Sequence, residues 1–354
     1  MQPFAYSASA ARIVFGAGSI DRLPAELDRL GVRRALVMCT PNQQEQAQAV
    51  ADRLPGRVAG TFAEAAMHVP IEVARKAREA ALALDADCAL AVGGGSTVGL
   101  GKAIALESGL PIIAVPTTYA GSEATPIYGI TEAGLKKTGR DPRVLPRVVI
   151  YDPELTLSLP LGLTVTSAIN AIAHAAEGLY AHDGNPVIAL MAEEGIRACA
   201  AALPPLHDDP CDLEARSRAL YGAWLCGTVL GAVSMGLHHK LCHTLGGSFD
   251  LPHAEVHSVM LAHALHYNAS AAPQAMARIA AALGATDAAL GVYRLAQAHG
   301  APLSLKAIGM PETGLDRAAD LAVSTPYPNP RPLLRRALRD LLQRAYHGEA
   351  PTPD

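Results

Sequence analysis

Histidine is concentrated in one part of this 354-residue chain. Seven of its 13 histidines fall within residues 238–266, far more than an even spread would place there. His239 and His243 stand four residues apart, as Asn170 and His174 do further upstream. Residues four apart lie on one face of a helix. Imidazoles gathered in this way can bind a divalent metal ion or, without one, donate hydrogen bonds and protons to a substrate.

A metal centre built from these residues would have an unusual set of ligands. His174, His239 and His253 offer three neutral imidazoles, whereas Asn170 offers an amide oxygen where a carboxylate would be expected. An amide is a much poorer ligand than a carboxylate for a divalent transition metal, and this set leaves the charge of the metal uncompensated. We therefore expect metal binding to be weak or absent.

A second candidate site follows an apolar run early in the chain. CALAV (88–92) predicts a buried strand, and the turn Gly93-Gly94-Gly95-Ser96 leads from it into a helix. Glycines let the backbone approach a phosphate closely, and the helix N-terminus supplies free N–H groups. Ser96 could cap the helix or donate to a phosphate. The four residues are also compatible with a plain tight turn, and they are not the G-x-G-x-x-G fingerprint of a standard Rossmann fold.

A hydroxyl-rich turn follows the next predicted strand, LPIIAVP (110–116). Its Thr117, Thr118 and Ser122 could bond a phosphate, a ribose or a carboxamide. Open α/β sheets bind ligands at the carboxyl ends of their strands. Two such turns on consecutive strands therefore predict a dinucleotide site.

The end of the first predicted strand bears on the choice between NADH and NADPH. An acidic residue there would bind the adenosine ribose of NAD, but CTPNQQ (39–44) contains none. Either cofactor is therefore expected, with Thr40 among the candidate cofactor contacts. Lys136, Lys137 and Arg140 are candidate partners for cofactor hydroxyls or for an anionic substrate, although a solvated basic loop explains them equally well.

The pattern of elements predicts two domains. Up to about residue 155, short apolar strands alternate with amphipathic helices, which is typical of a parallel sheet covered on both faces. Beyond residues 159–164 the chain is rich in Ala and Leu with a helical period. We place an α/β nucleotide-binding domain at residues 1–157 and an all-α catalytic domain at residues 158–354.

Composition narrows the classes of function. The net charge of −4 gives no indication of nucleic-acid binding, and no run of about 18 apolar residues predicts a membrane span. The start of the chain lacks the basic and apolar regions of a signal peptide. The six cysteines are dispersed without a CxxC pair, so they are expected to be small buried side chains rather than a disulfide framework. A cytoplasmic enzyme is expected.

In their order along the chain, these motifs resemble those of the iron-containing alcohol dehydrogenase family. The resemblance implies a dehydroquinate synthase-like fold and a homodimer. In that family an Asp-xxx-His pair and two later histidines bind Fe²⁺ or Zn²⁺. Here the aspartate position is Asn170, the histidine ligand positions are His174, His239 and His253, and His243 matches an additional family histidine. The motifs that carry the resemblance are Gly93-Gly94-Gly95-Ser96, Pro116-Thr117-Thr118, Gly121-Ser122-Glu123, Asn170-xxx-His174, His239-xxx-His243 and Pro252-His253.

The asparagine, together with residues 138–147 and the segment YPNP (327–330), is similar to the maleylacetate reductase branch of the family. The branch uses NADH or NADPH to reduce the C=C bond of maleylacetate, a dicarboxylate, to 3-oxoadipate during degradation of chlorinated and hydroxylated aromatics.

This similarity implies a role for each candidate side chain. His243 is the first candidate for proton donor, His174, His239 and His253 would bind and polarise the substrate, and Tyr327 is a further candidate. Three alternatives stay open. They are a metal-dependent alcohol or aldehyde dehydrogenase of the same family, a lyase like dehydroquinate synthase, and a nucleotide-binding protein without catalysis.

Overall fold

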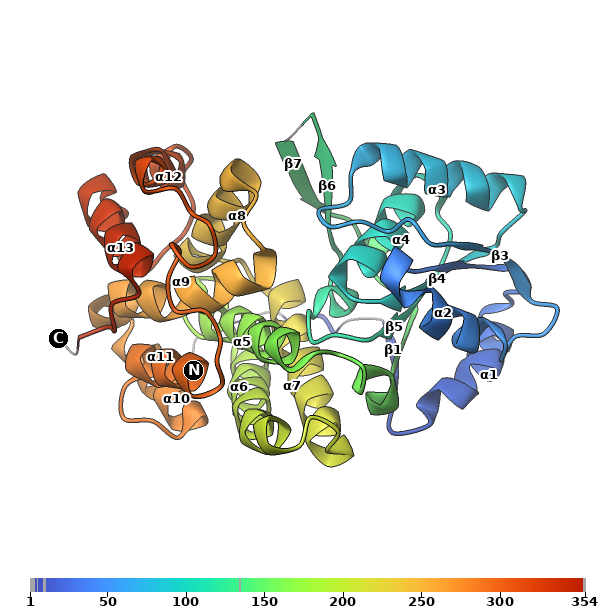
Figure 1. Cartoon of the computed structure of the whole chain (residues 1–354), viewed down its shortest axis with the longest axis horizontal. Coiled ribbons are helices and arrows are strands. Elements are labelled where there is room, and N and C mark those ends of the chain that lie inside the picture. Colours follow the sequence, from blue (N-terminus) through green and yellow to red (C-terminus); the bar gives the residue numbers. More distant parts are fainter. Residues whose placement is uncertain (1–3, 5, 9–10, 134, 353–354) are drawn as a thin grey trace. The chain divides into compact units, whose positions relative to one another are not determined.

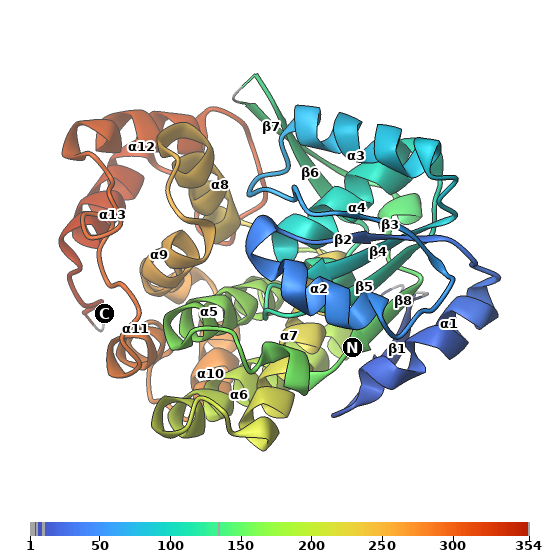
Figure 2. The same cartoon turned by 45° about the vertical axis from the view of Figure 1, so that its right-hand side comes forward.

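The computed structural model describes residues 4, 6–8, 11–133 and 135–352. Its backbone divides into two compact units, which are labelled by element in Figure 1 and turned by 45° in Figure 2. The α/β unit is Ala8–Leu159, and the helical unit is Pro160–Asp354 grouped with Met1–Ser7. The division follows Leu159, whereas the predicted boundary follows residue 157.

A six-stranded parallel sheet forms the centre of the α/β unit. Its order is β1-β8-β5-β4-β2-β3. The four predicted strands are confirmed as β2, β4, β5 and β8, whereas the edge strands β1 and β3 are missed because they are only partly buried. The bounds are β1 (Arg12–Phe15), β2 (Ala35–Met38), β3 (Val58–Phe62), β4 (Cys88–Gly93), β5 (Ile112–Pro116) and β8 (Val148–Tyr151).

Helices cover both faces of this sheet, as predicted. Leu27 of α1 and Val50 of α2 belong to the same apolar cluster as Leu90 and Ile113 of the sheet. Side chains alternate between the faces of a strand. The neighbours of Gly101 in α4 are Met38, Ala91 and Ile112, so α4 packs against the opposite face. The helices of this unit are α1 (Leu23–Leu30), α2 (Gln44–Ala51), α3 (Ile71–Ala83) and α4 (Gly95–Ser108).

The basic segment around Lys137 is a strand. β7 (Leu135–Arg140) pairs antiparallel with β6 (Ile127–Glu132) in a separate two-stranded hairpin. A solvated loop is therefore the wrong structure for this segment. The alternating register turns successive side chains to opposite sides of the hairpin, which an unbroken run of polar residues does not reveal.

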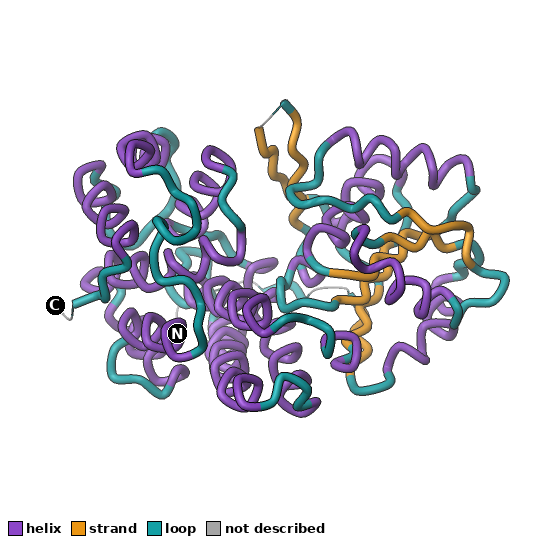
Figure 3. The backbone as a smooth tube through the Cα atoms, in the orientation of Figure 1, coloured by secondary structure: helices purple, strands orange, loops and turns teal. Residues whose placement is uncertain are grey.

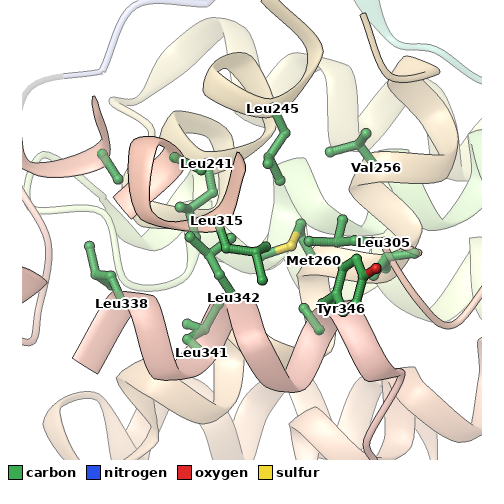
Figure 4. Close-up of a cluster of buried hydrophobic side chains, with 14 of the residues drawn as sticks. Leu241, Leu245, Val256, Met260, Leu305, Leu315, Leu338, Leu341, Leu342 and Tyr346 are labelled. Carbon is green, nitrogen blue, oxygen red and sulfur yellow. The ribbon is translucent and has the colours of Figure 1, made fainter. Parts of the chain in front are cut away.

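The described part of the helical unit contains no strand, which Figure 3 shows by colour. The all-α prediction for this part of the chain is confirmed. Leu241 of α8, Met260 of α9, Leu315 of α12 and Leu342 of α13 meet in one buried apolar cluster, which fixes α8 against α9 (Figure 4). The helices are α5 (Leu161–Gly178), α6 (Pro186–Asp208), α7 (Leu213–Ala232), α8 (Leu237–Phe249), α9 (His253–Asn268), α10 (Pro273–Leu283), α11 (Ala288–Ala298), α12 (Leu315–Val323) and α13 (Arg335–His347).

One stretch of the described chain, Pro273–Ala298, is long and apolar enough to cross a membrane. Gly284, with φ of 67°, ends α10 and divides the stretch into two helices of 11 residues each. A membrane-spanning helix needs about 20 residues, so neither half is long enough alone. The pair α7 and α8 meets the same criterion only when joined across a bend of 96°. All six cysteines are free, and only Cys211 is exposed.

Candidate active site

The carboxyl ends of three adjacent parallel strands carry the predicted nucleotide residues. β2, β4 and β5 are neighbours in the sheet, so Thr40, the glycine turn and Thr117 follow strands that end at one edge. Gln43 links two of these ends. Its Oε1 accepts from Thr40 Oγ1 at 3.0 Å, and its Nε2 donates to Thr117 Oγ1 at 2.8 Å. Sequence reasoning missed Gln43 because it searched this turn only for an acidic side chain.

Two of the three glycines in the glycine turn leave no room for a side chain. Gly93 has φ of 152°, and a Cβ there would lie 2.5 Å from Thr97 Oγ1. A Cβ on Gly94 would lie 2.8 Å from Thr118 Cγ2, whereas the nearest atom to one on Gly95 is 3.6 Å away. These contacts explain why side chains are absent where the backbone turns.

The start of α4 is arranged as an anion site. The helix begins at Gly95 with Gly94 as its N-cap, and no side chain caps it. The prediction that Ser96 caps the helix is therefore wrong, because Ser96 lies inside the first turn. Uncapped N–H groups at a helix start favour a phosphate. Ser96 is still a candidate to donate a hydrogen bond to a phosphate.

Gly94→Ala is expected to weaken NADH binding about tenfold or more, because overpacking of this kind costs roughly 1–3 kcal/mol. Gly94 has an ordinary φ of −89°, so the effect would come from the contact with Thr118. Fluorescence titration with NADH measures it. Gly162→Ala is the matched control for folding, because Gly162 lies on α5 in the helical unit and a Cβ there would meet no atom within 4 Å. Unchanged affinity in Gly94→Ala would show that this turn does not hold the cofactor.

A buried lysine holds the hydroxyl-rich turn in place. Lys102 of α4 is fully buried, and its Nζ donates to the carbonyl oxygens of Ser122 at 2.6 Å, Thr125 at 2.8 Å and Ile127 at 2.7 Å. Burial lowers the pKa of Lys102 to about 7, which the nearby carboxyl group of Glu123 opposes. Sequence reasoning missed Lys102, although it is the one charged residue in an apolar helical stretch, VGLGKAIAL (98–106).

Lys102→Met is expected to lower the free energy of unfolding by about 3–5 kcal/mol, because it leaves three buried carbonyl groups without a donor. Urea unfolding measures this loss. The matched control is Lys76→Met, because Lys76 is exposed on α3 and its Nζ lies 3.1 Å from a surface partner, Glu64. Exposed ion pairs contribute little, so the control should unfold like the wild type. Equal stability of the two variants would contradict a positioning role for Lys102.

The predicted histidines gather in the helical unit on three helices. Asn170, His174 and Glu177 are spaced i, i+4 and i+7 on α5, which places them on one helix face. The ring centroids of His174 and His239 lie 5.0 Å apart, and those of His239 and His243 lie 6.2 Å apart. His257 joins α9 to this group, with its centroid 5.1 Å from that of His239 and 4.4 Å from that of His253.

These histidines differ in their access to solvent. His243 is exposed and His253 half-buried, while His174 and His239 expose only 3% and 5% of their surface. His257 is fully buried, as is His238. Burial, followed by the neighbouring imidazoles, lowers the pKa of His257 well below its usual value. His243 and His253 are therefore the histidines that a bound substrate reaches most readily.

A buried carboxylate begins a row of hydrogen bonds through the cluster. Glu177 Oε2 lies 2.7 Å from His239 Nδ1, and His239 Nε2 lies 2.8 Å from His174 Nδ1. Burial alone would raise the pKa of Glu177, but the hydrogen bond from His239, with the imidazole of His238 and the N–H of Gly236, lowers it to about 2. Sequence reasoning missed Glu177, although its spacing of seven from Asn170 is the signal that could have found it.

Two of the family's ligand positions are hydrogen-bonded to each other instead of being spaced around a metal ion. Two nitrogens bound tetrahedrally at about 2.0–2.1 Å from a metal lie roughly 3.4 Å apart. His174 Nδ1 and His239 Nε2 are closer, at 2.8 Å, and face each other as a hydrogen-bonded pair. Asn170 Oδ1 is buried without a hydrogen-bond partner, but it brings no charge to the site.

A second group of possible metal ligands is His238, Cys242 and His257. Among the described residues, it is the group of three His, Cys or acidic side chains whose ligand atoms all lie within 4.8 Å of one another. In this group too, the nitrogens of His238 and His257 are hydrogen-bonded at 2.9 Å. Because both groups are already hydrogen-bonded internally, no step of the reaction is assigned to a metal.

The remaining candidates are placed as follows. The Tyr327 hydroxyl is buried without a hydrogen-bond partner, and burial raises its pKa. The Tyr327 side chain packs against the apolar cluster that contains Leu241 and Met260. Nζ of Lys137 lies 2.6 Å from Glu132 in an exposed ion pair, so its contact with a cofactor stays a prediction. The side chain of Lys136 lies outside the described residues. Arg140 ends β7.

Comparison with known proteins places both units in one family. The family model for iron-containing alcohol dehydrogenases matches residues 10–153. The family model for the C-terminal part of the same family matches residues 164–346. A maleylacetate reductase from Burkholderia cepacia is 65% identical over 352 residues, covering 99% of this chain and 100% of that protein.

Two solved structures are similar over nearly the whole chain. The maleylacetate reductase of Rhizobium sp. strain MTP-10005 is 56% identical with a TM-score of 0.95, covering 99% of this chain and 100% of that one. An iron-containing alcohol dehydrogenase from Corynebacterium glutamicum is 43% identical, also with a TM-score of 0.95 and with 99% of each chain covered. The dehydroquinate synthase-like fold implied by the motifs is confirmed.

Proposed function

Since the chain belongs to the iron-containing alcohol dehydrogenase family, whose members are oxidoreductases, we propose that it reduces the C=C bond of maleylacetate to give 3-oxoadipate. The electron donor is NADH or NADPH. The relatives that are 55–65% identical over nearly their whole length and are named maleylacetate reductase support this proposal.

Among the residues, Asn170 gives the strongest support for reduction of an enone. It replaces the family's aspartate, and its Oδ1 is buried without a partner beside a hydrogen-bonded pair of imidazoles. A simple ketone needs strong electrophilic help to stabilise the alkoxide that forms on it, commonly a metal ion. Maleylacetate is an enone, so its negative charge spreads into an enolate that hydrogen-bond donors can stabilise. A site without the family's carboxylate also repels a dicarboxylate less.

The reaction needs one hydride and one proton. The hydride adds to the carbon β to the ketone, the enolate forms, and the neighbouring carbon then takes a proton. His243 is the first candidate for that proton because it is the exposed histidine of the cluster. The other residues assigned to substrate binding are His174, His239 and His253, and Tyr327 is a further candidate.

The cofactor is assigned to the α/β unit. Ser96 and the three glycines before it would hold the pyrophosphate, and Thr117, Thr118 and Ser122 the nicotinamide side. Thr40 and Lys137 are further candidate contacts. The turn after β2 carries no acidic side chain between Cys39 and Gln44, which supports use of NADPH as well as NADH. We further infer that the enzyme works in the cytoplasm as a homodimer, acts in the degradation of aromatic compounds, and binds little or no metal.

An assay of substrates tests the proposal. Oxidation of NADH and of NADPH is followed by absorbance with maleylacetate and with a panel of simple ketones and aldehydes, before and after treatment with a chelator. We expect maleylacetate to be the preferred substrate and the rate to survive chelation. Preference for an aldehyde, with activity lost on chelation and restored by Fe²⁺ or Zn²⁺, would instead identify a metal-dependent alcohol or aldehyde dehydrogenase. Turnover without net oxidation of the cofactor would indicate a lyase.

A further inference from the structure

Both carboxylate oxygens of Glu177, beside the histidine cluster, accept hydrogen bonds. Its carboxylate is fully buried on α5, three residues after His174. A buried carboxylate is costly unless its oxygens are fully satisfied by donors. The surroundings of Glu177 meet that requirement with backbone and side-chain donors from a second helix.

The start of α8 supplies the backbone donors. The N–H groups of Gly236 and His238 each donate to the carboxylate at 2.9 Å, and that of His239 donates at 3.3 Å. Gly236 is the N-cap of α8 and has no side chain to cap the helix itself. A Cβ on Gly236 would lie 3.1 Å from Glu177 Oε1, so glycine lets the backbone approach the carboxylate. Glu177 therefore fixes where α8 begins relative to α5.

The same carboxylate also fixes one ring of the cluster. His239 Nδ1 lies 2.7 Å from Glu177 Oε2, and an ionised carboxylate can only accept a hydrogen bond. His239 Nδ1 must therefore carry the proton. In the neutral ring the other nitrogen, Nε2, is then an acceptor, and it faces His174 Nδ1 at 2.8 Å. The proton of neutral His174 must accordingly lie on Nδ1.

We propose that Glu177 is a positioning residue that sets the tautomer and ring orientation of His239 and, through it, of His174. This inference rests on the proposed function, because it concerns how the two rings serve the reduction of an enone. In the neutral state both rings direct their N–H groups along the row toward Glu177. Neither ring then offers an N–H group to the enolate, so His243 and His253 are left as the histidines that can donate to it.

Two substitutions separate this role from general stability. Glu177→Ala removes the acceptor for His239 Nδ1. Glu177→Gln can keep an oxygen there, but its NH₂ group then meets the N–H of His238 at the position of Oε1, so this variant is expected to lose stability while keeping the bond to His239. Tyr180→Phe is the matched control. It removes the hydrogen bond of 3.2 Å from Tyr180 to the other carboxylate oxygen and leaves His239 bonded.

The tautomer is read from the ¹⁵N shifts of the His239 ring in unliganded enzyme, assigned by comparison with a His239→Asn variant. We expect wild type, Tyr180→Phe and Glu177→Gln to keep the proton on Nδ1 and to retain most of kcat. We expect Glu177→Ala to lose the single tautomer and to lower kcat about 10–100-fold, as loss of a residue that orients an active-site ligand typically does. The Kd of NADH should not change, because the cofactor residues belong to the α/β unit.

A folded Glu177 variant in which tautomer and kcat change independently would overturn the proposal. If Glu177→Ala does not fold, Glu177→Gln decides alone: a shifted tautomer with wild-type kcat would contradict it, and a retained tautomer with retained kcat would support it. The shifts are measured without substrate. A wild-type enzyme that does not reduce maleylacetate would therefore refute the proposed function and leave the tautomer measurement intact.

Discussion

Asn170→Asp is expected to lower kcat/KM for maleylacetate about 100-fold, because it adds a negative charge where a dicarboxylate must bind. Two charges about 4 Å apart interact by roughly 4 kcal/mol near a protein surface, so a hundredfold loss, about 2.7 kcal/mol, needs only part of that repulsion. Asn170 is 3% exposed and its Oδ1 has no hydrogen-bond partner, so little in the site would offset the new charge. Steady-state kinetics in metal-free buffer measure the loss.

The same variant should bind Zn²⁺ or Fe²⁺ more tightly than the wild type. It restores the Asp-xxx-His spacing on α5, and carboxylate is a far better ligand than amide for these ions. Metal content after incubation and desalting provides the readout. Asn170→Ala is the control, because it removes the amide without adding charge. If Asn170→Asp reduces maleylacetate at the wild-type rate while becoming dependent on metal, electrostatic repulsion does not explain the asparagine.

The parts of the fold that depend on strong local patterns were predictable. Four strands of the sheet are unbroken apolar runs, and the helices of the second half show a clear helical period. β1 and β3 lie at the two edges of the sheet, where partial burial leaves only a weak apolar signal. The hairpin of β6 and β7 was missed for a related reason, since it has no buried face of its own that a pattern could report.

The residues of the candidate site likewise fall into those that the sequence predicts and those that it does not. His174, His239, His243 and His253 could be proposed because their residue type and spacing carry chemistry without any knowledge of the fold. Glu177, Gln43 and Lys102 were missed, because the partner that gives each its role is distant in sequence. Glu177 meets His239 from 62 positions away, and Gln43 meets Thr117 from 74. Until its partner is known, a charged or amide side chain in a helix is equally well explained as an ordinary structural or surface residue.

His243→Ala is expected to lower kcat for maleylacetate about 10²–10⁴-fold, the usual contribution of a positioned proton donor. The Kd of NADH should not change. His243 is the exposed histidine of the cluster, on α8 one turn after His239, so we expect the variant to fold. Because the position is exposed, added imidazole should restore part of the rate.

The control for this variant is His347→Ala, at an exposed histidine on α13 that takes no part in the cluster. It should behave as the wild type with and without imidazole. If His243→Ala retains its kcat, the proton comes from another group. His253 is then the next candidate, because it is the other ring that solvent reaches, while His174 and His239 direct their N–H groups toward Glu177. A loss confined to KM would instead make His243 a binding residue for a substrate carboxylate.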